Sequence, residues 1–144
     1  MPAVLFHYAD VSQISLKQKN VLKRLITELF ADEGKMLSRI DYIFCSDNFL
    51  LEINRTHLQH DYFTDIISFD LSEGDAVIGE IYISIDRVKE NTTTYYVSFK
   101  SELCRVILHG ALHLCGYKDK KKSEITTMRE KEDYYLQLLQ EKLK

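Results

Sequence analysis

The 144 residues predict an α+β fold, in which one domain spanning residues 1–144 contains a small mixed β-sheet covered by helices. Apolar segments follow the order strand, helix, strand, helix, two strands and then helices. The chain has one proline, at position 2, and no repeat or linker-like segment. A nearly uncharged apolar helix includes His109 and His113, which makes it the expected central, metal-binding helix.

The first strand and helix are predicted from local pattern. Residues 3–8 form a short apolar segment that favours a strand. Ser15 with Gln18 has the pattern of a capping box, so we expect the first helix to begin there. Apolar residues recur at helical spacing as far as Phe30, and Gly34 follows where a left-handed residue commonly ends a helix.

The next elements are a strand, a helix and a hairpin. Residues 39–45 are typical of a strand buried on at least one face, and Ser46 or Asp47 then caps a helix that runs to about residue 57. Residues 66–71 and 76–85 are rich in β-branched and aromatic side chains, and turn-forming residues separate them. They are predicted to pair as a hairpin.

Helices are predicted for the remainder of the chain. Residues 86–98 are polar and include three threonines, which are poor helix formers, yet a helix is expected there. From Phe99 to Leu114 a stripe of apolar residues indicates the buried central helix. Residues 123–143 predict a C-terminal packing helix whose inner face comprises Ile125, Met128, Tyr135, Leu138 and Leu139.

Composition narrows the function classes. The chain is 45% hydrophobic and 28% charged, with a net charge of −3, so any nucleic-acid partner must be held by local charge. The cysteines Cys45, Cys104 and Cys115 lack zinc-finger spacing, and the N-terminus lacks the form of a signal peptide. No apolar run reaches the roughly 18 residues needed to span a bilayer. We therefore expect a cytoplasmic protein with free thiols and no membrane partner, and the oligomeric state stays open.

The segment from His109 to Asp119 has the spacing of a catalytic metal site. Histidines four residues apart share one face of a helix, so both imidazoles can reach one ion. Gly116 is placed to end the helix, and the following turn can bring Asp119 back as a third ligand. Three ligands leave a position for water, as in catalytic zinc sites, and a metal-activated water indicates hydrolysis.

Two other interpretations of this segment stay open. His109 and His113 can be ordinary helix residues satisfied by hydrogen bonds, with Asp119 in a loop. The spacing also suits a metallopeptidase, but zinc peptidases of the H-E-x-x-H kind use the glutamate after the first histidine as the general base. Here that position is Gly110, so the usual peptidase base is absent.

Three blocks of the chain resemble one known family. Residues 109–119 match the signature H-G-x-L-H-L-x-G-Y of the YbeY-type rRNA maturation factors, which are metal-dependent endoribonucleases. Residues 61–69 resemble the family block D-x-x-T-D-V-L-S-F, and residues 79–84 resemble its G-D-I-x-I-S strand. Residues 51–54 look like the end of a family helix, so the resemblance covers about residues 40–135.

The resemblance implies a zincin-like α+β fold, one zinc ion, and 16S rRNA 3′-end maturation and ribosome quality control in the cytoplasm. Its partners would be rRNA and the small ribosomal subunit. Carried over by position, His109, His113 and Asp119 are the ligands. The family most often has histidine at the third position, and a carboxylate suits harder ions, so another divalent metal is an alternative. A ribosome-assembly factor with a structural metal is a further alternative.

Candidate residues for catalysis and RNA binding follow from the same blocks. Asp65 and Glu80 could orient water or a histidine, although Asp65 could equally cap the chain before a strand. The family commonly has an arginine where this chain has Leu58, and Arg55, or the nearby His57 and His60, could contact phosphate instead. Alternatively these are surface residues at a helix end. The lysine cluster, a set of basic residues that flanks Asp119 and could bind phosphate or form a solvated loop, comprises Lys118, Lys120, Lys121 and Lys122.

Overall fold

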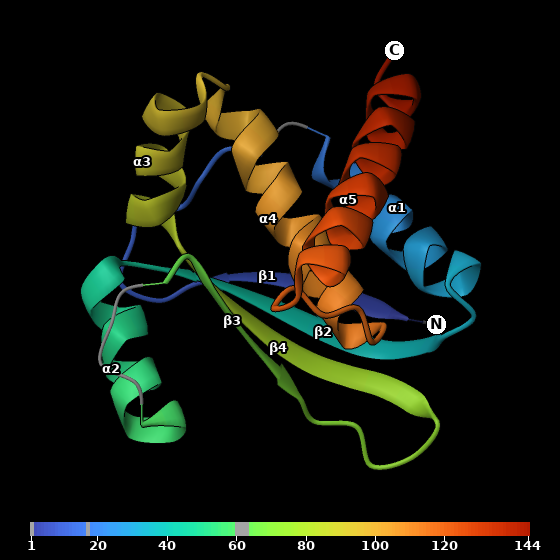
Figure 1. The fold of residues 1–144 in the computed structure, drawn as a ribbon, viewed down its shortest axis with the longest axis horizontal. Helices are drawn as coiled ribbons and strands as arrows, with labels where there is room; N and C mark the ends of the chain where they lie inside the picture. Colours follow the sequence, from blue (N-terminus) through green and yellow to red (C-terminus); the bar gives the residue numbers. More distant parts are fainter. Residues whose placement is uncertain (1, 17, 60–63) are drawn as a thin grey trace.

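The computed structural model describes residues 2–16, 18–59 and 64–144, and these ranges confirm the α+β class. The helices and strands follow the predicted order (Figure 1). The strands are β1 (Ala3–Tyr8), β2 (Met36–Cys45), β3 (Ile66–Asp70) and β4 (Ala76–Ser84). The helices are α1 (Lys19–Asp32), α2 (Asp47–Leu58), α3 (Ile85–Tyr95), α4 (Phe99–Leu114) and α5 (Lys122–Lys142).

The sheet is mixed, as expected, with the strand order β1-β2-β4-β3. β2 pairs in parallel with β1 and β4, whereas β3 pairs antiparallel with β4 and forms the predicted hairpin. The parallel pairs need crossover connections, and α1 makes the crossover from β1 to β2. The central β2 and β4 are therefore paired on both edges and rigidly support what packs on them.

The two faces of the sheet are covered differently. Ile81 and Ile83 of β4 point into the main core, which also contains the buried faces of α1, α4 and α5. Tyr82, between them, points to the other face, where Leu50 and Ile53 of α2 pack. Figure 1 shows α2 apart from the other helices, on the far side of the sheet. Within the described ranges, no helix is long and apolar enough to cross a membrane.

The start of α1 differs from the prediction. The helix begins at Lys19, and Gln18 before it adopts a left-handed conformation with φ of 57° and no side-chain capping bond. Ser15 therefore forms no capping box. The preceding segment is irregular because Ile14 and Leu16 pack against the core, and the Tyr8 hydroxyl donates to the Ile14 carbonyl at 3.1 Å. Tertiary packing outweighs the local capping pattern here.

The start of β2 and the inner face of α5 also differ from the prediction. β2 begins at Met36 rather than residue 39, because Met36 and Leu37 pair with Ala76 and Val77 of β4. On α5, Ile125 is 50% exposed and Leu138 only partly buried. Met128, Tyr135 and Leu139 are buried as predicted, and α5 also buries Glu132.

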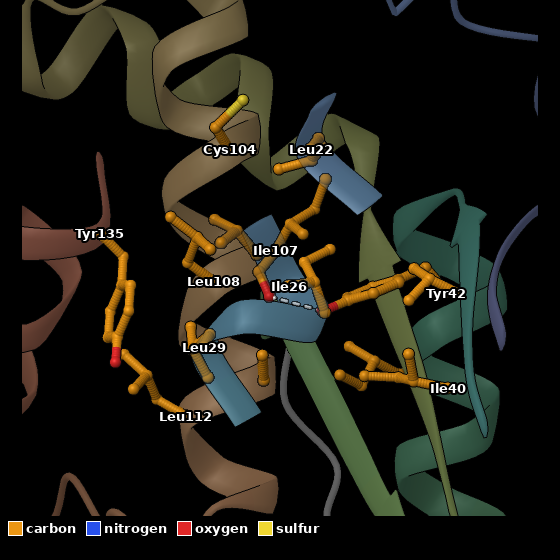
Figure 2. Close-up of a cluster of buried hydrophobic side chains, with 14 of the residues drawn as sticks. Leu22, Ile26, Leu29, Ile40, Tyr42, Cys104, Ile107, Leu108, Leu112 and Tyr135 are labelled. Atoms are coloured by element: carbon orange, nitrogen blue, oxygen red, sulfur yellow. Dashed lines mark hydrogen bonds between the residues drawn. The ribbon is translucent and has the colours of Figure 1, made fainter. Parts of the chain in front are cut away.

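The helix α4 lies unusually close to the sheet. A Cβ at Gly110 would lie 2.8 Å from Ile81 Cδ1 and 2.9 Å from Ile66 Cδ1, and a Cβ at Gly79 of β4 would lie 2.4 Å from Leu114 Cδ1. The buried hydroxyl of Tyr42 on β2 donates to the Ile107 carbonyl of α4 at 2.9 Å, as Figure 2 shows. Glycines at the contact and one buried hydrogen bond thus fix the position of α4.

We predict that Gly110→Ala lowers the free energy of unfolding by about 1 kcal/mol, the midpoint of the balance between helix propensity and overpacking. Alanine favours the helix by about 1 kcal/mol, but overpacking against Ile81 and Ile66 costs about 1–3 kcal/mol. Urea unfolding monitored by circular dichroism measures the change. Gly74→Ala is the control, because a Cβ at Gly74 meets nothing within 4 Å. A Gly110→Ala protein as stable as the control would contradict the close-packing argument.

Candidate metal centre

Two histidines of α4 and one aspartate of the following loop converge on a single point. His109 Nε2 lies 3.1 Å from Asp119 Oδ2, and His113 Nε2 lies 3.3 Å from the same oxygen. The two imidazole rings are nearly perpendicular, with centroids 4.5 Å apart. The structure therefore brings together the three side chains that the spacing singled out.

Asp119 reaches this point because α4 ends sharply. Gly116 adopts φ of 105°, a left-handed conformation that favours glycine. The Gly116 N–H donates to the His113 carbonyl at 3.0 Å, and the Tyr117 N–H donates to the Leu112 carbonyl at 3.1 Å. The reversal returns the chain along the last turn of the helix, and Asp119 stays 39% exposed beside the histidines.

The other ring nitrogen of each histidine is held by an acceptor. His109 Nδ1 lies 2.6 Å from Glu132 Oε2, and His113 Nδ1 lies 2.9 Å from the Tyr117 carbonyl oxygen. A carbonyl and an ionised carboxylate only accept, so each Nδ1 carries the proton and donates it. In the neutral imidazoles both Nε2 atoms consequently present lone pairs toward Asp119.

This donor set fits a divalent cation. Three lone-pair atoms that face one another repel unless a positive charge lies among them. Burial lowers the pKa of His109, but the hydrogen bond and charge of Glu132 outweigh burial, and the net pKa is raised. Tetrahedral zinc ligands about 2.1 Å from the ion lie about 3.4 Å apart, close to the separations of Asp119 Oδ2 from the two Nε2 atoms.

Sequence reasoning missed Glu132, which supports this site. Its side chain is only 5% exposed, and it lies on the inner face of α5 between Met128 and Tyr135. Burial raises the pKa of Glu132, but the hydrogen bonds from His109 and Arg105 lower it by more. The net pKa is therefore lowered, and the carboxylate stays ionised. A glutamate in the apolar stripe of an amphipathic helix was the available signal, because buried carboxylates need a partner.

A second hydrogen-bonded group stabilises the loop that carries Asp119. Glu33, just after α1, accepts hydrogen bonds from the hydroxyls of Tyr117 and Tyr135 and pairs with Lys131 at 3.1 Å. Burial raises the pKa of Glu33, but these donors lower it overall. The carbonyl of Tyr117 also accepts the hydrogen bond from His113 Nδ1. By holding Tyr117, Glu33 therefore helps to fix the orientation of His113, a candidate ligand.

A pocket of about 300 Å³ opens beside His109 and Asp119. Asp65, from the segment before β3, lies in its wall, and burial raises the pKa of this carboxyl while the charge of His109 opposes the rise. Asp65 is therefore close enough to interact electrostatically with the site. Its backbone carbonyl also accepts from the Ser84 N–H at 2.9 Å, which fixes it at the end of the hairpin.

The other candidates lie elsewhere. Glu80 is on the sheet face opposite α4, where it lines a shallow pocket with His7 and Asp41 and accepts from Tyr82 at 3.2 Å. Its strand position fixes this orientation, so the structure does not bring Glu80 to the histidines. Arg55 pairs with Glu52 on α2, which packs on that same face, and Leu58 is exposed at the end of α2.

The structure describes all four residues of the lysine cluster but only part of the block at residues 61–69. The four lysines are exposed in the loop that holds Asp119 and at the beginning of α5, so they border the site. His60, and residues 61–63 of the block that resembles the family, lie outside the described residues. His57 is exposed on α2, with its ring 6.1 Å from that of Phe69.

An α+β fold that presents two histidines and an aspartate to one point, beside an open pocket, has the layout of a single-metal hydrolase. Comparison with known proteins gives the family. The family model described as endoribonuclease YbeY matches residues 7–140. The chain belongs to the endoribonuclease YbeY family.

Individual relatives agree along most of the chain. The endoribonuclease YbeY of Flavobacterium psychrophilum is 52% identical over 113 residues, which cover 78% of this chain and 81% of the relative. That of Parabacteroides distasonis is 43% identical over 135 residues, or 94% and 95% of the two chains. The solution structure of TM1509 from Thermotoga maritima superposes with a TM-score of 0.62 at 28% identity, covering 94% of this chain and 88% of that one.

We predict that Glu132→Gln weakens metal binding by about 10–100-fold, because the amide is a poorer acceptor for His109 Nδ1–H and no longer makes that imidazole more basic. Competition of the purified protein with a chromophoric chelator for Zn²⁺ measures the affinity. Glu130→Gln makes the same change at an exposed position of the same helix. Equal zinc affinities for the two variants would show that Glu132 does not support the site.

Proposed function

We propose that this protein is a metal-dependent endoribonuclease that hydrolyses phosphodiester bonds of single-stranded RNA at the His109, His113 and Asp119 centre. The observation that carries the proposal is the convergence of the three ligand atoms, with both Nδ1–H groups already engaged by Glu132 and Tyr117. Membership of the endoribonuclease YbeY family supports RNA as the substrate.

The metal ion, when bound, would supply an activated water and a positive charge for a nonbridging phosphate oxygen. His109 Nε2, His113 Nε2 and Asp119 Oδ2 would hold it, and zinc is the ion that this donor set favours. The carboxylate of Asp119 also admits harder divalent ions. Glu132 and the Tyr117 carbonyl keep the imidazoles oriented, and the exposure of Asp119 leaves the centre accessible to a strand of RNA.

Asp65 is the proposed proton acceptor for the attacking water. It lies in the wall of the pocket beside His109, and burial raises its pKa, which makes it a better base than an exposed aspartate. Glu80 and Arg55 are not part of this proposal, because both lie on elements of the opposite sheet face.

The proposal extends to the biological substrate. The family resemblance points to the 3′ end of 16S rRNA, and so to the small ribosomal subunit as partner and the cytoplasm as location. One domain, residues 1–144, would perform this reaction. The exposed lysine cluster supports a polyanionic substrate, because it places four positive charges beside the site of a chain whose net charge is −3.

The alternative functions are less well supported. A peptidase of the H-E-x-x-H kind needs a glutamate at position 110, where the structure buries glycine against Ile81 and Ile66. A purely structural metal favours a closed site with four protein ligands. Among the described residues the convergent group contains three, and a pocket opens beside it.

Removing a ligand is expected to abolish RNA cleavage. His113→Ala should lower the rate by about 100-fold or more, because loss of the ion removes several kcal/mol of transition-state stabilisation. A chelator should have the same effect on the wild type, and added Zn²⁺ should restore it. The measurement is gel analysis of a labelled rRNA precursor, with casein as the peptidase substrate.

His7→Ala is the matched control for that experiment, because His7 lies on the other sheet face and pairs with Asp41. It should cleave as the wild type does. Wild-type RNA cleavage by His113→Ala, or release of casein peptides that requires His113, would contradict the proposed function.

The lysine cluster is expected to provide phosphate contacts. Replacing its four members by alanine should reduce the magnitude of the slope of log K against log salt by up to about 3, since each neutralised phosphate of a single strand contributes about 0.7. Fluorescence anisotropy of labelled RNA between low and moderate salt measures the slope. An unchanged slope would remove the cluster from the RNA-binding surface. The control is the same charge change elsewhere, at Lys19, Lys23, Lys35 and Lys142.

A further inference from the structure

The pocket beside His109 contains polar groups that coordination of a metal does not use. Its volume is about 300 Å³, at the lower end of the range for small-ligand sites, and it runs from the metal ligands to the junction of α3 and α4. Asn91 and Tyr95 of α3 and Glu102 of α4 line the end away from Asp119. A strand bound with its phosphate at the metal ligands would place an adjoining nucleotide in this space.

The charge of the pocket selects which part of a nucleotide enters it. Asp65, Glu102 and Glu132 contribute carboxyls to its wall. The guanidinium of Arg105 is engaged by Glu132 at 2.8 Å and Asp133 at 2.9 Å. Arg129, the other arginine in the wall, is 58% exposed and lies 3.5 Å from Glu132. With Asp119 the wall has four carboxyls against two guanidiniums, so the interior is acidic and disfavours phosphate. The uncharged base, with its N–H donors, is the part that suits the pocket.

Asn91 and Glu102 form an ordered hydrogen-bonding edge at that end. Asn91 Nδ2 donates to Glu102 Oε2 at 3.4 Å, and because a carboxylate only accepts, the amide must present its NH₂ group to it. Glu102 is 7% exposed, and burial raises its pKa. In the described part of the chain, Glu102 Oε1 accepts no hydrogen bond. A buried carboxylate with one long bond gains from further donors.

A tyrosine in the wall of the pocket and the tyrosine after it are both largely exposed. Tyr95, in its wall, is 61% exposed, and Tyr96, the next residue, is 95% exposed with φ of 54°. A tyrosine ring with its face available to solvent, beside a polar cleft, provides a platform on which any base can stack. Stacking supplies affinity, and the edge formed by Asn91 and Glu102 supplies selectivity.

We propose that this pocket binds a guanine base next to the scissile phosphate, recognised by Asn91 and Glu102 and stacked near Tyr95. The protein edge presents one donor, Asn91 Nδ2–H, followed by two acceptors, Glu102 Oε2 and Oε1. The Watson–Crick edge of guanine presents the complement, the acceptor O6 followed by the donors N1–H and N2–H₂. The inference rests on the proposed function, because it assumes cleavage at the adjoining metal centre.

The other bases match this edge less well. Cytosine has the same order of groups as the protein, so its N3 and O2 acceptors would face the Glu102 oxygens and repel them. Adenine and uracil each place at least one acceptor opposite Glu102, because neither presents two adjacent donors on this edge. A carboxylate therefore discriminates for guanine, and a mismatch leaves a buried acceptor unpaired.

The test uses four oligouridine RNAs that carry G, A, C or U at one central position. We expect the metal-loaded protein to cleave beside guanine about tenfold faster than beside the other bases. Glu102→Gln should cut this preference to less than about twofold and raise cleavage beside adenine. The glutamine amide presents one donor and one acceptor, which suits adenine, where the carboxylate of Glu102 presents two acceptors. Glu130→Gln, on the exposed face of α5, should keep the wild-type preference.

Binding of the same RNAs to metal-free protein, measured by anisotropy, gives a second readout that does not depend on cleavage. Tighter binding of the guanine RNA by about tenfold, lost in Glu102→Gln, supports the subsite. Equal cleavage and equal binding for all four bases, or a guanine preference retained by Glu102→Gln at an unchanged Tm, would overturn it. Failure of the proposed function looks different, since His113→Ala would then cleave all four RNAs as the wild type does.

Discussion

The close packing of α4 against the sheet is the constraint on which the site depends. Gly110 and Gly79 permit an approach at which a Cβ would collide with Ile81 or Leu114, and the Tyr42 hydroxyl holds the Ile107 carbonyl at the same contact. With that side of the helix committed to the core, His109 and His113 must face the loop that follows α4 and the neighbouring α5. Gly110 thus removes the peptidase base and seats the helix at the same time.

Once α4 is placed, the electrostatics of the site depend on acceptors from distant parts of the chain. Glu132 on α5 and the carbonyl of Tyr117 each take an Nδ1–H, which turns both Nε2 atoms toward Asp119. A buried ionised glutamate is costly by itself, and Arg105 together with His109 offsets that cost. Glu33 connects α1 to the site in a similar way, because it accepts hydrogen bonds from the hydroxyls of both Tyr117 and Tyr135. The helices that cover the sheet therefore also orient the ligands.

The distribution of charge around the site separates two kinds of recognition. The exposed lysine cluster flanks Asp119 in the chain, whereas Glu102 and Asp65 line the acidic pocket beside His109. Phosphates are attracted to the first region and excluded from the second, whereas a base with hydrogen-bond donors fits the second. A chain with a net charge of −3 can bind a polyanion in this way, because the contact is local and the remaining surface needs no positive field.

The sequence alone determined the α+β class, the order of elements and the three candidate ligands, because these depend on short-range periodicity: a spacing of four on a helix, and a glycine that ends it. It failed where long-range packing competes with local pattern. Ile14 and Leu16 displaced the helix start from Ser15, pairing with β4 extended β2, and strand alternation turned Glu80 away from the histidines. Only the tertiary structure placed Glu132 and Glu33, because each meets its partners through packing of segments distant in the chain, and it also set Glu102 of α4 against Asn91 of the preceding α3.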